Sequence, residues 1–517
     1  MFELAKQASL KSSSQKLATS VGRRNAWGRL SFAYFSLAKQ RKVGIVLLRR
    51  NYLRSKEKME HKMLILNKQT RAKRHLDNLT FIPQAVEKVD FLTSSTAFKQ
   101  QILALIKQAK FRIYLTALYF EKDEAGQEIL DALYQAKLAN PQLEIKILVD
   151  WHRAQRGRIG EETQSSNADW YTQMREQYAL PTEQEIAFYG VPVNKREIFG
   201  VLHLKGFVFD DTLLYSGASI NNVYLQQFER YRYDRYHQIE NKTLADSWVN
   251  FIQQNILTNP AVNRLDQANR PKTIEIRPLV KTFRKELSQQ EYRFNGRTMD
   301  HSQLMLSPLV GLGRKNPLNK TIEALFFQVQ QKLTICTPYF NFPRSISQRI
   351  SWLLDNGKQI EIIVGDKTAN DFFTLPEEKF TMASALPYLY EKNLRAFAKK
   401  FDHYIQNGQL TIRLWKDGKN SYHLKGVWID ERYILLTGNN LNPRAWKLDA
   451  ENAVLISDPK GELSEKTQGE LAQIRTHTTV LTHYSDLEEL KDYPEKVKKL
   501  LKKFGRVKLD KIVKMLL

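Results

Sequence analysis

One pattern of residues occurs twice in this chain, and the two copies stand 220 positions apart. Residues 112–120 resemble residues 332–340, and residues 201–211 resemble residues 421–431 at the same offset. Self-similarity at a fixed interval indicates a duplicated structural unit. The chain of 517 residues is therefore expected to fold as two related halves, which suits its length because single cores rarely grow beyond roughly 300 residues.

Each half alternates predicted helices and strands. The first pair of similar runs is predicted to form buried strands, preceded by helices at 98–110 and 321–331 and followed, after another helix, by strands at 143–150 and 359–366. Strands that alternate with helices predict parallel sheets covered on both faces. The fold class is therefore α/β. Residues 259–317, rich in Asn, Pro, Arg and Gly, are expected to connect the halves.

Both halves contain a His-x-Lys-x4-Asp pattern. The first copy consists of His203, Lys205 and Asp210, and the second of His423, Lys425 and Asp430. In an extended strand residues i and i+2 project from the same face, so each His and its Lys are expected to face one point. Lysine there neutralises phosphate oxygens, while imidazole attacks phosphorus or protonates a leaving oxygen. We predict two facing copies and a double displacement that requires no metal or other cofactor.

Each motif is followed by a turn with amide and hydroxyl side chains. The first turn offers Ser219 and Asn221, and the second offers Asn440 and Asn442. Such groups add hydrogen bonds to phosphate oxygens, so these four residues are predicted to bind substrate.

Four acidic residues accompany the motifs. Asp234 and Glu451, further downstream, are candidates to orient the histidines by accepting from the second ring nitrogen. A structural salt bridge is the alternative for both. Asp210 and Asp430 either take part in the chemistry directly or hold the ends of their strands.

At these residues the sequence resembles the phospholipase D superfamily. Four longer segments resemble the Gram-negative type I CDP-diacylglycerol–serine O-phosphatidyltransferases: residues 150–157, 214–225, 365–371 and 436–446. The resemblance implies two duplicated phospholipase D-like domains, at 63–285 and 286–490, each a mixed β-sheet flanked by helices. The superfamily's usual Gly-Ser-x-Asn turn is altered to Gly-Ala-Ser-Ile-Asn and Gly-Asn-Asn-Leu-Asn here.

The same resemblance implies an activity. It is the transfer of a phosphatidyl group from CDP-diacylglycerol to L-serine, with release of CMP and a phosphatidyl-histidine intermediate. His203 is expected to be the nucleophile and His423 the acid and then the base, because the first copy is the usual nucleophile in resembling enzymes. Asp150, His152 and Arg153 follow a predicted strand, where α/β sheets tend to place ligands, and are candidates to select serine. An interdomain polar network is their other interpretation.

Charge and apolar patterning indicate an anionic partner. The net charge is +25, of which residues 1–62 contribute +12. Residues 491–517 combine apolar positions at helical spacing with many lysines, typical of an amphipathic helix on an anionic membrane surface. Packing of that apolar face on the body is the alternative. Because no apolar run is long enough to span a bilayer, we expect a cytoplasmic protein peripherally bound to the inner face of the cytoplasmic membrane.

Two further features complete the expectations. The basic extension 1–62 is either disordered or the product of a misassigned start, with Met59 and Met63 as the other starts. The single cysteine, Cys336, is expected to be buried and fits a reducing cytosol.

Other functions stay open at this point. The motifs also suit a phospholipase D, a nuclease or a cardiolipin synthase, although the membrane spans usual in the last are missing from the sequence. A non-catalytic protein that binds polyanions such as nucleic acid would explain the charge but not two intact motifs.

Overall fold

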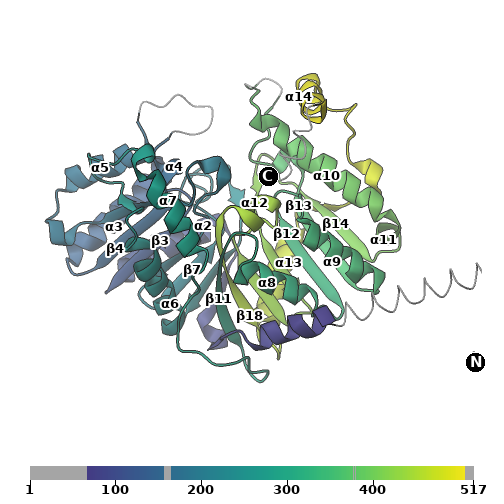
Figure 1. Ribbon diagram of the computed structural model, residues 1–517, viewed down its shortest axis with the longest axis horizontal. Coiled ribbons are helices and arrows are strands. Elements are labelled where there is room, and N and C mark those ends of the chain that lie inside the picture. The colour runs from purple at the N-terminus through teal and green to yellow at the C-terminus, as the bar shows by residue number, and fades with distance from the viewer. Residues whose placement is uncertain (1–66, 157–164, 376–377, 379, 507–517) are drawn as a thin grey trace, which may run out of the picture. The chain divides into compact units, whose positions relative to one another are not determined.

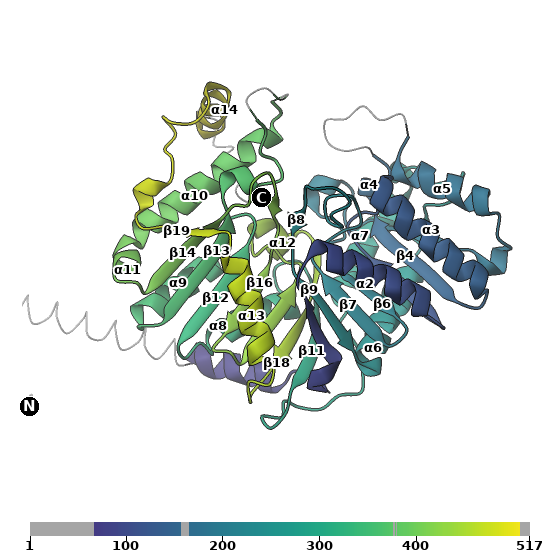
Figure 2. The ribbon, with the colours of Figure 1, turned by 180° about the vertical axis from the view of Figure 1, so that it is seen from behind.

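A computed structural model describes residues 67–156, 165–375, 378 and 380–506, with backbone only for 504–506. The chain divides into Met1–Lys68 and Gln69–Leu517, and the following description concerns the second unit. The basic extension at 1–62 and the last eleven positions of the predicted C-terminal helix lie outside the described residues. Two large sheets with helices on both faces form most of the unit (Figures 1 and 2), and a third sheet has two short strands.

The first sheet has eight strands in the order β10-β5-β4-β3-β6-β7-β9-β2. Their bounds are β2 Val89–Leu92, β3 Arg112–Thr116, β4 Glu144–Asp150, β5 Ala187–Val191, β6 Gly206–Phe209, β7 Thr212–Ser216, β9 Tyr236–Glu240 and β10 Asn263–Arg264. Strands β3, β4 and β5 are parallel, as the helix–strand alternation predicts. The remaining neighbours are antiparallel.

The second sheet repeats this plan with nine strands in the order β1-β11-β18-β17-β16-β12-β13-β14-β19. Their bounds are β1 Ile82–Pro83, β11 Met305–Leu312, β12 Lys332–Thr337, β13 Gln359–Gly365, β14 Leu410–Trp415, β16 Gly426–Ile429, β17 Tyr433–Thr437, β18 Ala450–Ser457 and β19 Thr478–Val480. Only β12, β13 and β14 run parallel to one another. The duplicated α/β fold with mixed sheets is thus confirmed, and the parallel pairing predicted from the helix–strand alternation is found in three strands of each sheet.

Helices cover both sheets. In the first half they are α2 Ser95–Gln108, α3 Glu124–Ala139, α4 Trp151–Ala154, α5 Asn167–Tyr178, α6 Lys242–Ile252 and α7 Thr273–Leu287. In the second half they are α8 Pro317–Phe326, α9 Arg344–Asp355, α10 Leu386–Lys400, α11 Asp402–Gln406, α12 Pro443–Lys447, α13 Ser464–Arg475 and α14 Glu495–Arg506. Helix α8 begins four residues before the predicted start at 321, because Asn316 caps it and proline occupies its first turn.

The stretch expected to connect the halves is largely ordered structure. Within 259–317, α7 buries Ile276, Val280 and Phe283, and β11 pairs with β18 along its whole length. A composition rich in Asn, Pro, Arg and Gly therefore did not mark a simple linker here.

The two halves also share structure. Strand β1 comes from the start of the first half yet pairs with β11 in the second sheet. One apolar cluster contains Leu214 and Trp248 of the first half together with Cys336 and Trp415 of the second. Cys336 is fully buried, as predicted. The halves therefore pack on a common core.

Candidate active site

The two His-x-Lys pairs lie just before their strands rather than within them. His203 and Lys205 precede β6, and His423 and Lys425 stand between β15 (Ser421–Tyr422) and β16. The prediction that they are strand residues is wrong by a few positions. Both segments are nonetheless extended, because the opposite half pairs with them.

Backbone contacts between the halves hold both motifs. The His203 amide donates to the carbonyl of Ala450, 2.9 Å away, at the start of β18. The His423 amide donates to the carbonyl of Tyr233 at 2.8 Å, next to the parallel pairing of β15 with β8 (Arg232–Tyr233). Asn452 adds two bonds to the backbone of Lys205, accepting from its amide and donating to its carbonyl. Each histidine is therefore fixed by the half to which it does not belong.

The predicted orienting acids cross over in the same way. His203 Nδ1 lies 2.9 Å from Glu451 Oε2, and His423 Nδ1 lies 2.8 Å from Asp234 Oδ2. All four side chains are buried. Each carboxylate contacts the histidine of the other half through Nδ1, so Nε2 is the nitrogen of each ring that has no carboxylate partner.

The two lysines lie beside the histidines and are almost completely buried. Lys425 Nζ lies 2.9 Å from His423 Nε2 and 3.2 Å from Asp234 Oδ2. Lys205 Nζ donates to Ser219 Oγ at 3.3 Å, so the structure brings this predicted phosphate ligand to the site.

A glycine in the second turn allows close packing at the site. A side chain at Gly438 would place its Cβ 2.9 Å from Lys205 Cγ and 3.7 Å from His203 Nδ1. Any larger residue would push against the first motif.

The charges around the two histidines differ. Burial, reinforced by Lys205 and Lys425, lowers the pKa of His203 well below its usual value. Burial and Lys425 also lower the pKa of His423, to about 4, although the neighbouring Asp234 carboxylate opposes this. At His423 a neighbouring carboxylate opposes the lowering of the pKa, whereas at His203 the neighbouring lysines add to it.

The two carboxylates are shifted in opposite directions. Burial opposes ionisation of Asp234, but Lys425 and His423 outweigh it and lower the Asp234 pKa to about 2. Burial and the neighbouring Asp449 raise the pKa of Glu451 well above its usual value. The duplicated site is therefore electrostatically unsymmetrical. Asp234, next to His423, is ionised, whereas Glu451, next to His203, resists ionisation.

Both motif aspartates lie at the far ends of the strands that follow the histidines. Asp210 accepts hydrogen bonds from the backbone amides of Lys110, Phe111 and Arg112, where β3 begins. Asp430 does the same for residues 330–332 at the start of β12. Both aspartates thus make the contacts of the second of the two predicted roles, holding strand ends.

The asparagines of the turns have mainly structural contacts. Asn221 donates to Glu121 and accepts from the Tyr224 amide, and Asn442 caps α12. Asn440 differs, since its Oδ1 is buried without a hydrogen-bond partner among the described residues. Of these three, Asn440 retains an unused acceptor.

The three residues predicted to select serine make mainly structural contacts. Asp150, fully buried, accepts from the amides of His152 and Arg153 through Oδ1 and from the Leu202 amide through Oδ2. Burial raises its pKa to about 6. His152 contacts the carbonyl of Asn194. Arg153 pairs with Glu197 at 3.8 Å, and Arg444 of the second half donates to the Glu197 carbonyl. The group is therefore a polar network that fixes the residue preceding His203 and reaches the other half, as its second interpretation predicted.

Sequence reasoning missed a charged and aromatic cluster beside His423. Arg232 Nε lies 2.8 Å from Asp371 Oδ1, the Tyr339 hydroxyl donates to Asp371 Oδ2 at 2.9 Å, and Tyr224 Oη lies 3.2 Å from His423 Nε2. Asp371 ends one of the segments that carry the family resemblance. Nothing in its spacing links it to Arg232.

Comparisons with known proteins agree with this geometry. Residues 102–254 and 322–475 match the family model described as "Cardiolipin synthase, PLD-like domain". The CDP-diacylglycerol–serine O-phosphatidyltransferase of Haemophilus influenzae is 59% identical over 88% of this chain and all of its own length. That of Escherichia coli is 50% identical over the same shares. The crystal structure of the Haemophilus influenzae phosphatidylserine synthase superposes with a TM-score of 0.84 at 58% identity, covering 87% of this chain and all of the other.

One family-model match falls in each half, and close relatives align along their full lengths. The first match includes His203 and Lys205, and the second includes His423 and Lys425. The chain therefore belongs to the CDP-diacylglycerol–serine O-phosphatidyltransferases of the phospholipase D superfamily.

Proposed function

We infer that the protein transfers the phosphatidyl group of CDP-diacylglycerol to the hydroxyl of L-serine and releases CMP. The observation that carries this inference is the pair of buried histidines, each with a lysine beside it and a carboxylate from the opposite half. One ring can attack the phosphorus while the other protonates the leaving group on its opposite side. The family membership indicates that the substrates are CDP-diacylglycerol and L-serine.

In the first step Nε2 of His203 attacks the phosphorus that bears diacylglycerol. The bond from phosphorus to the CMP oxygen breaks, and His423 gives its Nε2 proton to that oxygen. Lys205 and Lys425 balance the charge on the nonbridging oxygens. The products are CMP and a phosphatidyl-histidine.

In the second step His423, now neutral, takes the proton from the serine hydroxyl. The serine oxygen bonds to phosphorus, the bond to His203 Nε2 breaks, and its electron pair returns to the ring. Phosphatidylserine leaves, and both histidines regain their starting states.

The assignment of roles rests on the unlike surroundings of the rings. A nucleophile must be unprotonated and an acid must carry a proton, so the two pKa values have to differ in that sense. Burial lowers the pKa of both rings. At His423 a carboxylate that is itself ionised, Asp234 at Nδ1, opposes the shift, whereas at His203 Lys205 and Lys425 add to it. The anionic phosphates of a bound substrate raise both, and His423 is the ring better placed to hold the proton.

Trapping tests the mechanism. Enzyme incubated with CDP-diacylglycerol labelled in the phosphate next to diacylglycerol, without serine, should accumulate acid-labile, base-stable label on the peptide containing His203. Label on the His423 peptide reverses the roles. Label on neither, together with kinetics that require both substrates to be bound at once, removes the covalent intermediate. Formation of phosphatidylserine from radiolabelled serine tests the activity itself.

We propose further that the enzyme works at the anionic inner surface of the cytoplasmic membrane. No helix within the described ranges is long and apolar enough to cross a bilayer. The C-terminal helix was expected to lay its apolar face on the membrane, with packing on the body as the alternative. In α14 the alternative holds for Val497 and Leu501, which pack with Tyr388 and Leu389. Its exposed lysines, at 496, 499, 502 and 503, remain as an electrostatic contact for anionic lipid or another polyanion.

A further inference from the structure

Arg232 and Asp371 form an ion pair that joins the two halves beside His423. Arg232 belongs to β8 of the first half, and Asp371 follows β13 of the second. Their side chains are only 16% and 11% exposed, so they are largely desolvated. Tyr119, Tyr224 and Tyr339 surround the pair with aromatic rings and hydroxyl groups.

The pair is next to the histidine that handles the acceptor's proton. Arg232 pairs in register with Ser421, two residues before His423. The Arg232 guanidinium lies 4.7 Å from the centre of the Tyr224 ring, whose Oη is 3.2 Å from His423 Nε2. The Tyr339 ring, whose hydroxyl donates to Asp371, is centred 6.1 Å from the His423 ring.

Stability alone does not account for such a pair. Desolvation of two charges offsets most of their attraction, so a buried ion pair is weak evidence of a stabilising role. Burial opposes ionisation of Asp371, but Arg232, His423 and hydrogen bonds from Tyr339 and Ser421 outweigh it and lower the Asp371 pKa. The carboxylate beside His423 is therefore ionised and suited to a cationic group.

Serine has the matching chemistry. Its carboxylate suits the planar fork of an arginine, its ammonium group suits a carboxylate and phenolic oxygens, and its hydroxyl is one carbon away from the centre that carries both charges. We propose that Arg232 binds the carboxylate and Asp371 the ammonium group of the acceptor serine, holding its hydroxyl at His423 Nε2. This rests on the proposed function, and deepens it by naming the acceptor site.

Bound in this way, serine replaces one ion pair by two and adds no net charge to the site. The reaction is the second step described above: the hydroxyl proton passes to His423, the O–P bond forms, and the bond to His203 breaks. Water has neither charged group, so it gains nothing from Arg232 and Asp371, and the pair favours transfer over hydrolysis.

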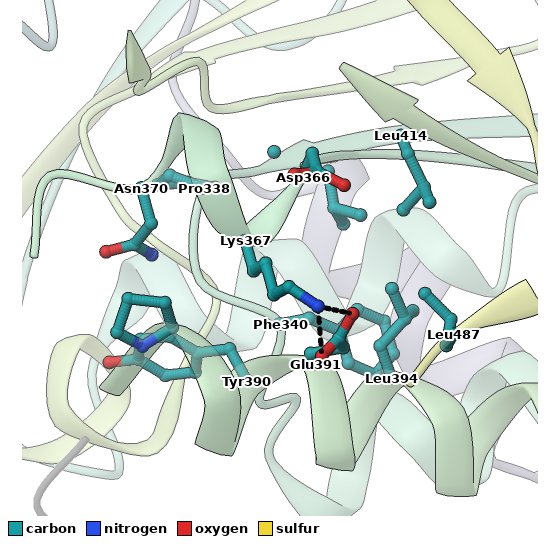
Figure 3. A pocket seen from close by; sticks show the side chains of 13 residues that line it. Pro338, Phe340, Asp366, Lys367, Asn370, Tyr390, Glu391, Leu394, Leu414 and Leu487 are labelled. Atoms are coloured by element: carbon teal, nitrogen blue, oxygen red, sulfur yellow. Dashed lines mark hydrogen bonds and ion pairs between the residues drawn. The ribbon is translucent and has the colours of Figure 1, made fainter. Parts of the chain in front are cut away.

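A neighbouring pocket is the competing location. It is lined by Pro338, Lys367, Asn370, Tyr390 and Glu391 among others, and Figure 3 shows Lys367 directed at Glu391. Lys367 Nζ lies 3.1 Å from Glu391 and 2.6 Å from Glu488. Two carboxylates for one ammonium group leave this pocket poorly suited to the carboxylate of serine.

The test compares Arg232→Gln and Asp371→Asn with two controls, Lys367→Met in that pocket and Arg264→Gln, which breaks a part-buried pair with Asp266 away from the histidines. Each site variant should raise the KM for serine roughly 10- to 100-fold, the effect of losing a hydrogen-bonded charge. The KM for CDP-diacylglycerol and the slow release of CMP without serine should stay within threefold of wild type. Arg232→Lys and Asp371→Glu should recover part of the loss.

Two competitors of serine show which residue binds which charged group. Ethanolamine lacks the carboxylate of serine, and 3-hydroxypropionate lacks its ammonium group. Arg232→Gln should weaken inhibition by 3-hydroxypropionate only, and Asp371→Asn inhibition by ethanolamine only. An unchanged KM for serine in both folded variants, or an equal loss of CMP release without serine, overturns the acceptor site. If the wild-type protein forms no phosphatidylserine at all, the proposed function fails instead.

Discussion

Replacing Asp210 should weaken the fold and spare the chemistry. Its carboxylate binds three backbone amides at the start of β3, two through Oδ1 and one through Oδ2, and its φ is 49°. Each bond contributes about 0.5–1.5 kcal/mol, and an alanine in this left-handed conformation costs about 1 kcal/mol more. We therefore expect losses of about 1 kcal/mol for Asp210→Asn, about 2–3 for Asp210→Gly and about 3–5 for Asp210→Ala.

The assay is thermal unfolding beside steady-state turnover. For roughly 450 ordered residues, an unfolding entropy of about 2.1 cal/mol/K per residue converts 1 kcal/mol into about 1 °C of Tm. Asp210→Ala should lower Tm by about 3–5 °C. Asp210→Asn should stay nearest to wild type, and Asp210→Gly should lie between Asn and Ala. At a temperature where all variants are folded, kcat should stay within threefold. A normal Tm with a loss of kcat above roughly 100-fold would refute this reasoning and make Asp210 a participant.

Three further predictions concern charge. Lys425→Met should abolish most turnover while Tm changes little, and near-normal activity in this variant contradicts the motif assignment. Burial and Lys425 lower the pKa of Lys205 to about 7. The side chain is charged below that pH, so kcat/KM for CDP-diacylglycerol should fall as pH rises through about 7. A flat pH profile would contradict a role of the Lys205 charge in binding phosphate. Changing Lys496, Lys499 and Lys502 to glutamine should weaken binding to phosphatidylglycerol vesicles without lowering activity in detergent; unchanged binding places the contact elsewhere.

Much of the architecture was readable from the sequence because it repeats. The common offset identified two equivalent units, and the strands at β3, β4, β12 and β13 start within one residue of their predicted positions. Apolar runs between helical patterns are strong local signals of this kind. The order of the remaining, antiparallel strands depends on pairings that leave no such signal.

The site was predicted in its parts and not in its connections. The sequence named both histidines and both acids but could not show that Glu451 serves His203 and Asp234 serves His423, since an offset relates equivalent residues and not contacting ones. Arg232 and Asp371 escaped for the same reason. The two motif aspartates show a second limit of the sequence pattern. A residue that recurs at a fixed spacing can hold a turn just as well as it can take part in catalysis, and both of these bind backbone amides.

The crossing of the two carboxylates means that neither half contains a complete acid–base unit. Cohesion of the halves and proton transfer are therefore linked equilibria: whatever separates Glu451 from His203 also separates Asp234 from His423. Because the halves share one apolar core and β1 of the first half pairs in the second sheet, both contacts depend on the same packing. Stability of the seam and turnover should therefore fall together when that packing is weakened.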